Sequence, residues 1–343
     1  MLDSGFAGVQ ELEERLSRPT PAVIDAVSSL DGDLLVLGVG GKMGPTLATM
    51  ARRALDVPGC NRRVIGVARF SDPVVREKLD SAGVQTIRSD LMQEGALAAL
   101  PDVPNIVYMV GHKFGTTGQE ALTWAMNAYL PGRVAERFRR SRIVVFSSGN
   151  VYPLTPVAWG GPAENVAPAP VGEYAQSVLG RERIFEFYAR RLQIPSVLFR
   201  LNYAVEMRYG VLLDVARKVW TGEVIDLSMG HVNVIWQGDA NGYALRALHL
   251  AEVPPRVLNV TGPETVSVRA VAQRFGELLG RQPNLRGTEQ PEALLSNAGQ
   301  AFKVFGYPSV ALEQVIEWVA GWVIDGGPVL DKPTKYAVRD GRF

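Results

Sequence analysis

Short apolar segments alternate with helix-length amphipathic segments along much of the chain. The apolar segments are DLLVLGVG, RRVIGVARF, GVQTIRSD, NIVYMVG, RIVVFSS and PSVLFRLN. Near-continuous apolar runs of this length are typical of strands that are buried on both faces of a parallel sheet. The intervening segments, for example 45–55 and 119–140, are long enough for helices. The alternation therefore predicts an α/β fold with helices on both sides of a doubly wound parallel sheet.

The same pattern divides the chain into four parts. Helical periodicity precedes the first apolar segment and is interrupted at Pro19 and Pro21, and after residue 203 helices mix with isolated strands. Open α/β sheets bind ligands at the carboxyl ends of their strands, where we expect the later part to form a cover. The predicted parts are an N-terminal helical extension (1–31), a sheet domain that some later segments rejoin (32–203), a smaller C-terminal α/β substrate lobe (204–325) and a polar tail on the surface (326–343).

Composition narrows the class of protein. The 343 residues carry a formal net charge of +1 and are 47% hydrophobic, so nothing in the charge favours binding to nucleic acid or to an anionic membrane. Cys60 is the only cysteine, which excludes an internal disulfide framework and fits a reducing compartment. The sequence has no secretory-signal pattern, no run of ~18 apolar residues and no metal-ligand spacing. We expect a soluble, cytoplasmic protein without a metal.

Glycines recur at the junction between the first apolar segment and the first helix. Gly38, Gly41 and Gly44 stand three residues apart in LLVLGVGGKMGPTLATM. Glycines in this position permit a tight turn, close approach of a pyrophosphate to the backbone, and close packing of the helix on the sheet. The amides and the positive dipole end of the helix favour phosphate binding. The loop, which includes Lys42 and Met43, therefore predicts a dinucleotide site and a sheet of Rossmann type.

The end of the second strand bears on the choice of dinucleotide. NAD-binding folds usually carry an acidic residue there, which binds the ribose hydroxyls. The segment VIGVARFSD instead places Arg69 after the strand, and its first carboxylate is Asp72. A guanidinium can pair with a 2′-phosphate, so the sequence favours NADP as cofactor, with NAD as the alternative.

These and later motifs together resemble the extended short-chain dehydrogenase/reductase family, in particular the NAD-dependent epimerase/dehydratase group that includes the UDP-galactose 4-epimerases. The resemblance covers roughly residues 32–320. FSSGNVY looks like the family's Ser-Ser-x-x-Val-Tyr segment, and EYAQSVLGRE opens a long helix at a tyrosine, Tyr174. MVGHKFG is similar to the loop after the family's fourth strand, and Asn127 resembles its buried helix asparagine.

The resemblance implies roles for individual residues. Tyr174, Ser148 and Lys113 would be catalytic. The implied cofactor-binding residues are Gly38, Gly41, Lys42, Met43, Gly44, Arg69, Asp90, Leu91, Val110, Gly111, Lys113 and Tyr174, and the implied substrate-binding residues are Ser148, Asn150, Asn202 and His112. The resemblance also implies a homodimer formed by two helices, near 121–140 and 174–192.

One departure from the family affects the proton-transfer site. Four residues after Tyr174, where the family has a lysine, this chain has Val178. The family's lysine holds the nicotinamide ribose and lowers the pKa of the tyrosine through its charge. Two cations are candidates to replace it: Lys113 on the neighbouring loop, and Arg181 on the same helical face but two turns, ~10 Å, further along. We expect Lys113 to supply the charge.

A second departure concerns the substrate. The segment HVNVIWQGD lacks the arginine with which the family clamps a sugar-nucleotide diphosphate. The expected function is therefore an NAD(P)-dependent oxidoreductase or epimerase that acts on a hydroxyl or keto group of a sugar-like small molecule other than a standard nucleotide sugar. Two alternatives remain open on this fold: a non-catalytic NAD(P)-binding sensor or regulatory protein, and a non-redox enzyme that catalyses an elimination.

Overall fold

A seven-stranded parallel sheet forms the centre of the computed structural model, which describes residues 5–113, 115–332 and 334–341. The strands are β1 (Leu34–Leu37), β2 (Val64–Ala68), β3 (Gln85–Arg88), β4 (Asn105–Tyr108), β5 (Arg142–Ser148), β7 (Ser196–Leu201) and β12 (Arg256–Val260). Their order across the sheet is β12-β7-β5-β4-β1-β2-β3. The order reverses direction at β1, which pairs with both β2 and β4, and such a reversal opens a crevice at the carboxyl ends of the two central strands.

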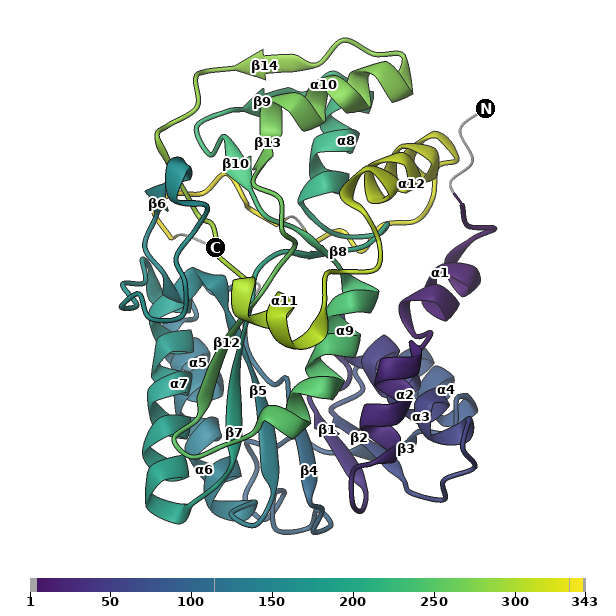
Figure 1. Ribbon diagram of the computed structural model, residues 1–343, viewed down its shortest axis with the longest axis vertical. Helices are drawn as coiled ribbons and strands as arrows, with labels where there is room; N and C mark the ends of the chain where they lie inside the picture. The colour runs from purple at the N-terminus through teal and green to yellow at the C-terminus, as the bar shows by residue number, and fades with distance from the viewer. Residues whose placement is uncertain (1–4, 114, 333, 342–343) are drawn as a thin grey trace.

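Helices cover both faces of the sheet (Figure 1). They are α2 (Pro21–Ser28), α3 (Gly44–Asp56), α4 (Pro73–Ser81), α5 (Glu120–Trp124), the π-helical turn η1 (Ala125–Tyr129), α6 (Leu130–Arg137), α7 (Glu173–Leu192), α9 (Gln237–Arg246) and α11 (Gly299–Phe305). Successive strand residues point to opposite faces, so Val36 packs toward α2, α3, α9 and α11 while Leu35 packs toward α6 and α7. Both faces are buried, which explains the near-continuous apolar strands.

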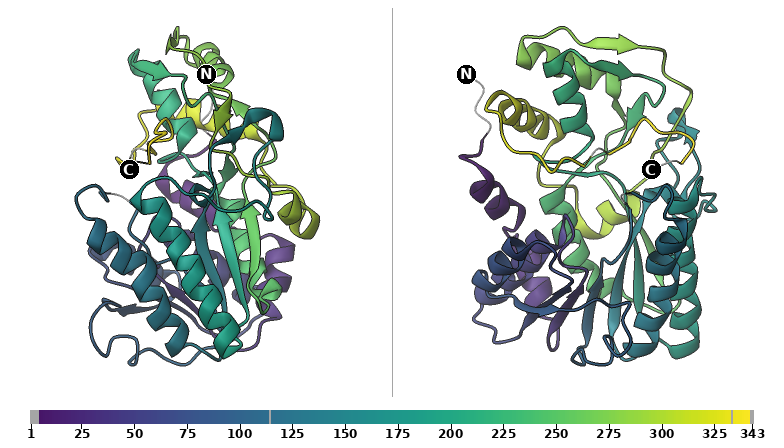
Figure 2. Two further views of the ribbon diagram at one scale, coloured as in Figure 1. Left: turned by 90° about the vertical axis from the view of Figure 1, so that its left-hand side faces the viewer. Right: turned by 180° about the vertical axis from the view of Figure 1, so that it is seen from behind.

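A smaller lobe lies over the carboxyl edge of the sheet (Figures 1 and 2). Its core is formed by α8 (Val211–Thr221), α10 (Val268–Leu279) and α12 (Leu312–Ile324). The remaining short elements are β6 (Thr155–Pro156), β8 (Ala204–Val205), β9 (Val224–Asp226), β10 (His231–Val232), β11 (Ile235–Trp236), β13 (Val266–Ser267), β14 (Asn284–Arg286), β15 (Glu292–Ala293), η2 (Gly149–Val151), η3 (Val157–Trp159) and η4 (Ala247–Leu250). Ser267 caps α10 by accepting a hydrogen bond from the amide of Ala270.

The N-terminal extension forms two helices, α1 (Val9–Leu16) and α2. Helix α2 begins at Pro21, and the side chain of Thr20 caps it by accepting a hydrogen bond from the amide of Val23. The extension is fastened to the sheet domain by Asn241 of α9, whose Nδ2 donates to Leu16 O (3.3 Å). It therefore adds a layer outside α3 and α9.

The predicted α/β fold with a Rossmann-type parallel sheet is confirmed. Two findings concern the later part of the chain. RVLNV, beyond residue 203, is β12 and pairs in parallel with β7 at the edge of the central sheet. In the C-terminal tail, Thr334 and Tyr336 are buried rather than laid on the surface. Within the described residues, no helix is long and apolar enough to cross a membrane.

Candidate active site

Three glycines shape the loop between β1 and α3, each in a different way. Gly38 has a φ of 86°, and a Cβ there would lie 2.8 Å from the amide nitrogen of Val110, so only glycine fits the turn. A Cβ on Gly44 would collide with the carbonyl of Val39, so α3 can pack closely on the loop only because that atom is absent. Beside Gly41 a Cβ would meet only the carbonyl oxygen of Gly38, at 3.5 Å. The open space at Gly41 fits the approach of a pyrophosphate.

Lys42 extends from this loop toward the C-terminal lobe. Its Nζ donates a hydrogen bond to Ala204 O (2.9 Å) and lies 3.8 Å from the centre of the Tyr209 ring. Burial lowers the pKa of Lys42 to about 7; the negative charge of Glu206 opposes this shift, and the positive charge of Lys113 adds to it. Lys42 thus joins the glycine loop to the lobe across the crevice.

The ends of β2 and β3 carry the residues expected beside the adenosine part of a dinucleotide. Arg69 follows β2 with an exposed side chain. Asp72, the first carboxylate after that strand, caps α4, since its Oδ1 accepts a hydrogen bond from the amide of Val74 (3.0 Å). Asp90 and the buried Leu91 follow β3. The capping role of Asp72 leaves Arg69 as the ionic group that directly follows β2.

Asn127 fixes the loop after β4. Its Oδ1 accepts a hydrogen bond from the amide of His112 (2.9 Å), and its Nδ2 donates to the carbonyl of the same residue (3.0 Å). The His112 ring nitrogen Nδ1 is in turn hydrogen-bonded to Thr123 Oγ1 (2.9 Å). Asn127 lies in η1, and π-helical turns of this kind occur often at functional sites. The clamp holds Gly111 and Lys113 against the cavity described below.

Strand β5 and helix α7 bring Ser148 and Tyr174 together. Ser148 is the last residue of β5, Tyr174 is the second residue of α7, and their side chains are hydrogen-bonded to each other. Both side chains are largely buried. A tyrosine and a serine in contact can bind one substrate oxygen from two directions, so the pair expected from the sequence is assembled.

A buried ion pair sets the position of α7 against the sheet. Glu182 of α7 accepts two hydrogen bonds from Arg200 of β7, Nε to Oε1 (2.9 Å) and Nη2 to Oε2 (2.6 Å). Two further hydrogen bonds support the pair, because Ser147 donates to Glu182 Oε1 and Arg200 Nη1 donates to the hydroxyl of Tyr152 (2.7 Å). Such a pair is strongly destabilising if one partner alone is removed. It therefore fixes the register between α7 and β5.

Val178 and Arg181 are the two residues of α7 that bear on the missing lysine, because they follow Tyr174 by one and two helical turns. Val178 is 1% exposed and packs in a small apolar cluster with Val151, Tyr152 and Tyr174, so no cation lies one turn after the tyrosine. Arg181 lies one turn further along α7 and is 6% exposed.

The guanidinium of Arg181 is held by two neutral acceptors. Its Nη1 donates to Phe146 O (2.7 Å), its Nη2 donates to Asn127 Oδ1 (2.8 Å), and its Nε is buried without a partner among the described residues. None of the ion pairs between described residues includes it. A buried positive charge therefore stands beside the cavity without a carboxylate to neutralise it.

The positive charge acts on the tyrosine. Burial raises the pKa of Tyr174, whereas the charge of Arg181 and the hydrogen bond with Ser148 both lower it. From the sequence we expected Lys113 rather than Arg181 to supply this charge. Lys113 does line the same cavity, and burial lowers its pKa to about 8. The cation that lowers the pKa of Tyr174 in the structure is nevertheless Arg181, which the sequence ranked second.

These groups line one cavity of about 220 Å³ between the sheet edge and the lobe. Of the predicted residues it is lined by Gly38, Gly41, Lys42, Met43, Gly111, His112, Lys113, Ser148 and Tyr174. Lining residues that the sequence did not assign to the site are Met109, Phe146, Ser147, Arg181, Leu201, Tyr203, Ala204, Val205, Tyr209, Gly210 and Thr334. The lining contains three cations, Lys42, Lys113 and Arg181, and no carboxylate among the described residues. No group of three metal-ligand side chains occurs within those residues either.

Two predicted substrate residues do not line this cavity. The side chain of Asn150 accepts a hydrogen bond from Ser148 Oγ (3.1 Å), which orients the serine. Asn202 is 2% exposed and packs against Gly149, where a Cβ would lie 2.8 Å from Asn202 Oδ1. Their contacts make both residues supports of the turn that follows Ser148.

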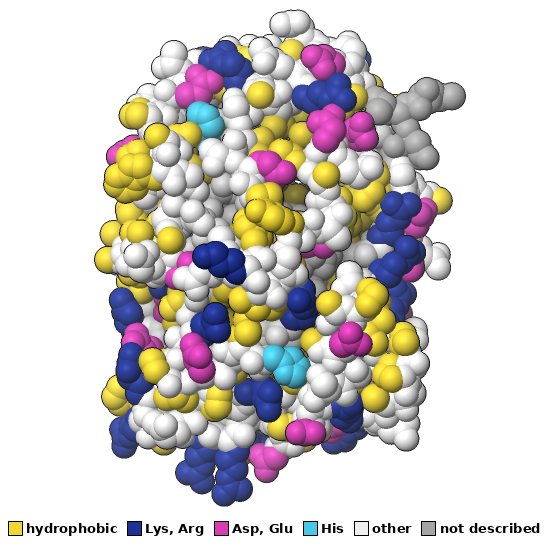
Figure 3. Space-filling model, in the orientation of Figure 1, with side chains coloured by type: hydrophobic (Ala, Val, Ile, Leu, Met, Phe, Trp, Pro, Cys, Tyr) yellow, Lys and Arg dark blue, Asp and Glu magenta, His cyan; other side chains and the backbone are white. Residues whose placement is uncertain are grey.

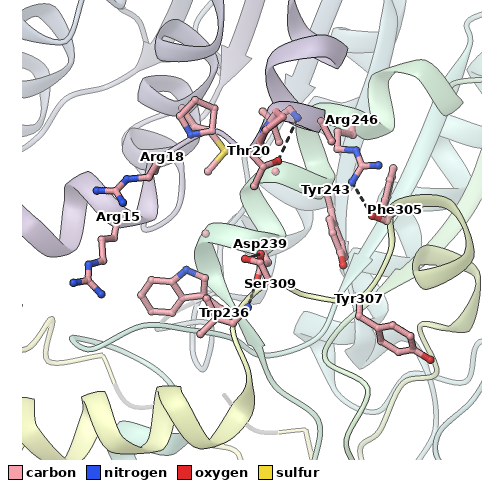
Figure 4. Close-up of a pocket in the computed structure, with 18 of the residues that line it drawn as sticks. Arg15, Arg18, Thr20, Trp236, Asp239, Tyr243, Arg246, Phe305, Tyr307 and Ser309 are labelled. Carbon is pink, nitrogen blue, oxygen red and sulfur yellow. Dashed lines mark hydrogen bonds between the residues drawn. The ribbon is translucent and has the colours of Figure 1, made fainter. Parts of the chain in front are cut away.

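A larger cavity, of about 540 Å³, lies on another face of the molecule, between the N-terminal extension, α9 and the loop before α12 (Figure 4). Apolar side chains gather around a hollow on this face in Figure 3. Its carboxylate, Asp239, accepts hydrogen bonds from Ser309 Oγ (2.6 Å) and the amide of Val310 (3.2 Å). Asp239 therefore ties α9 to that loop, and the cavity contains none of the residues expected to bind the dinucleotide.

The chain is similar to solved structures in fold, whereas comparisons of its sequence give no match. No protein-family profile matches the chain, and no curated protein matches its sequence. Among solved structures, MoeE5 in complex with UDP-glucose and NAD superposes with a TM-score of 0.69 at 20% sequence identity, covering 86% of this chain and 99% of that one. The chain has the fold of the nucleotide-sugar 4-epimerases. UDP-glucuronic acid 4-epimerase from Bacillus cereus (TM-score 0.69, 17% identity, 85% of this chain and 96% of that one) has this fold too.

A third similar structure is UDP-glucose 4-epimerase from Thermus thermophilus in complex with NAD, with a TM-score of 0.69 and 18% identity over 84% of this chain and 97% of that one. Nearly the whole of each of the three solved chains is matched. At these low sequence identities the similarity establishes the fold alone, and a shared fold does not determine the reaction.

Replacement of Gly41 by valine should abolish dinucleotide binding, because the side chain would occupy the open space beside the loop backbone. The protein should remain folded, since no existing atom lies closer than 3.5 Å to the new Cβ. Binding of NAD and NADP is measured by calorimetry, with Gly41→Ala as a milder control and circular dichroism as the test of folding. Unchanged affinity in the folded valine variant would remove the glycine loop from the cofactor site.

The affinity for a dinucleotide should fall as the pH rises from about 6 to about 8. Lys42 has a pKa lowered to about 7, so it is protonated below that pH and loses its charge above it, while a bound pyrophosphate favours the protonated form. Lys42→Met should bind more weakly at the low end and show a flatter pH dependence, whereas the exposed Lys303→Met should match wild type. Equal pH slopes for the Lys42 variant and wild type would contradict this assignment. Lys113 adds a decline near its own pKa of about 8 in all these proteins.

Proposed function

We propose that the protein is an NAD(P)-dependent oxidoreductase or epimerase that acts on a hydroxyl or keto group of a small molecule. The observation that carries this proposal is the hydrogen-bonded pair of Ser148 and Tyr174 in a cavity shared with the glycine loop. The fold of the 4-epimerases supports it. A hydroxyl pair with an adjacent buried cation fits proton transfer better than simple retention of a cofactor.

The residues present fit a dinucleotide. The glycine loop and the start of α3 would bind the pyrophosphate through backbone amides, and the loop after β4 would lie at the nicotinamide ribose, with Lys113 in reach. Lys42 would add a positive charge on the lobe side. The bound nicotinamide supplies hydride transfer to or from a carbon atom of the substrate.

The chain's own groups handle the substrate oxygen. Tyr174 donates its phenolic proton to that oxygen when a ketone is reduced and accepts a proton from the hydroxyl when an alcohol is oxidised. Ser148 turns its one hydroxyl proton from Asn150 Oδ1 to the substrate oxygen, and this second hydrogen bond polarises a carbonyl. Arg181 stabilises the phenolate form of Tyr174, and because a guanidinium does not lose its proton in proteins, this charge is constant over the working pH range.

The choice between the two dinucleotides follows from the end of β2. The solved 4-epimerases contain NAD. In this chain Asp72 is used as a helix cap, and Arg69 stands exposed beside the expected ribose position. We therefore retain NADP as the proposed cofactor, with NAD as the alternative.

Replacing Tyr174 by phenylalanine should lower turnover by ~10²-fold or more, because it removes the proton donor while leaving the ring. Activity is found by screening hydroxy and keto compounds for oxidation or reduction of the nicotinamide. Tyr188→Phe, on the outer side of the same helix, is the matched control and should retain wild-type turnover. Wild-type turnover in the Tyr174 variant would refute the mechanism. Dinucleotide binding with no turnover of any compound would favour a non-catalytic NAD(P)-binding sensor or regulatory protein.

Arg69→Ala should weaken NADP more than NAD, by about 1–3 kcal/mol if a charged hydrogen bond to the 2′-phosphate is lost. Calorimetric titration of both dinucleotides into wild type and variant measures the difference. Arg76→Ala, an exposed arginine on the neighbouring helix α4, controls for loss of general positive charge. Tighter binding of NAD than NADP to wild type would overturn the NADP proposal.

We also propose a homodimer that pairs the outer faces of α5, η1 and α7. These faces expose large apolar side chains, namely Leu122 (45%), Tyr129 (61%) and Phe187 (52%). Light scattering should give twice the chain mass of 37.3 kDa at micromolar concentration. A variant with Tyr129→Glu and Phe187→Glu should be monomeric, while Tyr307→Glu, at an equally exposed tyrosine elsewhere, should remain dimeric. A monomeric wild type would contradict the proposal.

A further inference from the structure

The last part of the chain crosses from the lobe to the start of α7 (Figure 2, yellow segment). This C-terminal segment comprises residues 328–332 and 334–341. It is tied to the lobe at one end, where the amide of Leu330 donates to Arg208 O (3.1 Å), and further along, where Arg339 Nη1 donates to Glu292 O (2.9 Å). Gly341 packs so closely against Val171 that a Cβ would collide with its carbonyl. The segment thus runs from the lobe to the N-terminal end of α7, the helix that carries Tyr174.

The middle of the segment is built into the molecule. Thr334 is 4% exposed, and both its amide (2.9 Å) and its hydroxyl (2.6 Å) donate to the same carboxylate oxygen of Asp214 on α8. Tyr336 is 3% exposed and packs in the core of the lobe. These contacts are the kind that hold a permanent wall, since a loosely draped tail would bury neither residue.

The segment reaches the reacting groups. Thr334 lines the same cavity as Tyr174 and Ser148. The positive charge of Lys332 is near enough to Lys42 to contribute to the lowering of its pKa, so the segment also passes close to the glycine loop. It therefore borders both the expected substrate side and the expected cofactor side of the cavity.

We propose that the C-terminal segment is the outer wall of the candidate active site and restricts its substrate to a small hydroxy or keto compound without a nucleotide group; this rests on the function proposed above. The cavity volume is about 220 Å³, below the ~300–1,000 Å³ of typical ligand sites, and part of it is needed for the nicotinamide. On the side of the cavity that Thr334 lines, a bulkier group could extend only by displacing this buried residue. The absence of an arginine in HVNVIWQGD agrees with this wall, because no diphosphate then needs a clamp.

Hydrogen exchange tests the wall without reference to activity. In the full chain saturated with NAD or NADP, whichever binds more tightly, the peptide covering the segment should exchange on the order of 10²-fold more slowly than an unstructured peptide. Asp214→Asn and Thr334→Val should accelerate this exchange, whereas Thr221→Val, at an exposed threonine of the same helix α8, should not. Addition of UDP-glucose to wild type should leave exchange unchanged and give no heat of binding. Rapid exchange in wild type, or binding of UDP-glucose with exposure of the segment, overturns the proposal.

Substrate size is tested in the same proteins. Wild type should turn over small hydroxy or keto compounds and not UDP-glucose. In a chain ending at Gly327, the ratio of kcat/KM for bulky ketones to kcat/KM for small ketones should rise by at least ~10-fold. If that chain does not fold, the Asp214→Asn, Thr334→Val double variant should show the same rise. Turnover of UDP-glucose by wild type, or an unchanged ratio, overturns the wall. If no compound is turned over by any of these proteins, the proposed function fails, and hydrogen exchange still decides whether the segment is a fixed wall.

Discussion

A buried positive charge without an acidic partner is the constraint around which the candidate site is organised. The guanidinium of Arg181 donates to a backbone carbonyl and to an asparagine side chain, lies 5.7 Å from the centre of the Tyr108 ring, and is almost fully removed from water. Burying a charge without an opposite charge beside it costs free energy of folding. The group that benefits is Tyr174, whose ionised form would otherwise be strongly disfavoured by burial. One residue thus links the β4 loop, the end of β5 and the proton-transfer tyrosine, because Asn127 also clamps His112.

The fold supplies the rest of the geometry. The reversal of strand order at β1 and β4 opens the crevice, the three glycines shape its floor, and the Glu182–Arg200 pair fixes α7 so that Tyr174 meets Ser148. The C-terminal lobe closes the other side through Lys42, Tyr209 and the last residues of the chain. Val178 fits this arrangement as an apolar neighbour of the tyrosine, and in the proposed mechanism Arg181 supplies the positive charge that a lysine at position 178 would have supplied.

Features that depend on a few consecutive residues could be predicted from the sequence. Apolar runs identified six strands of the central sheet, and the glycine spacing predicted a tight turn at Gly38 and close helix packing at Gly44, both of which the backbone geometry bears out. The sequence ranked Lys113 above Arg181 by distance along the helix axis, a measure that leaves out the direction of the side chain. Helix side chains point back toward the N-terminus, so a long arginine reaches toward residues a turn or more earlier. The burial of Thr334 and Tyr336 and the return of β12 to the sheet depend on contacts between distant segments, which no local pattern contains.

The ionisation of Tyr174 itself tests this account most directly. Its ring signal can be followed against pH by NMR in protein with ¹³C-labelled tyrosine and a bound dinucleotide, after assignment from the spectrum of Tyr174→Phe. The account predicts a higher pKa for Tyr174 in Arg181→Met than in wild type, and a pKa close to wild type in Arg181→Lys, which keeps the charge. The same titration midpoint in all three proteins would contradict the claim that Arg181 has taken over the role of the lysine.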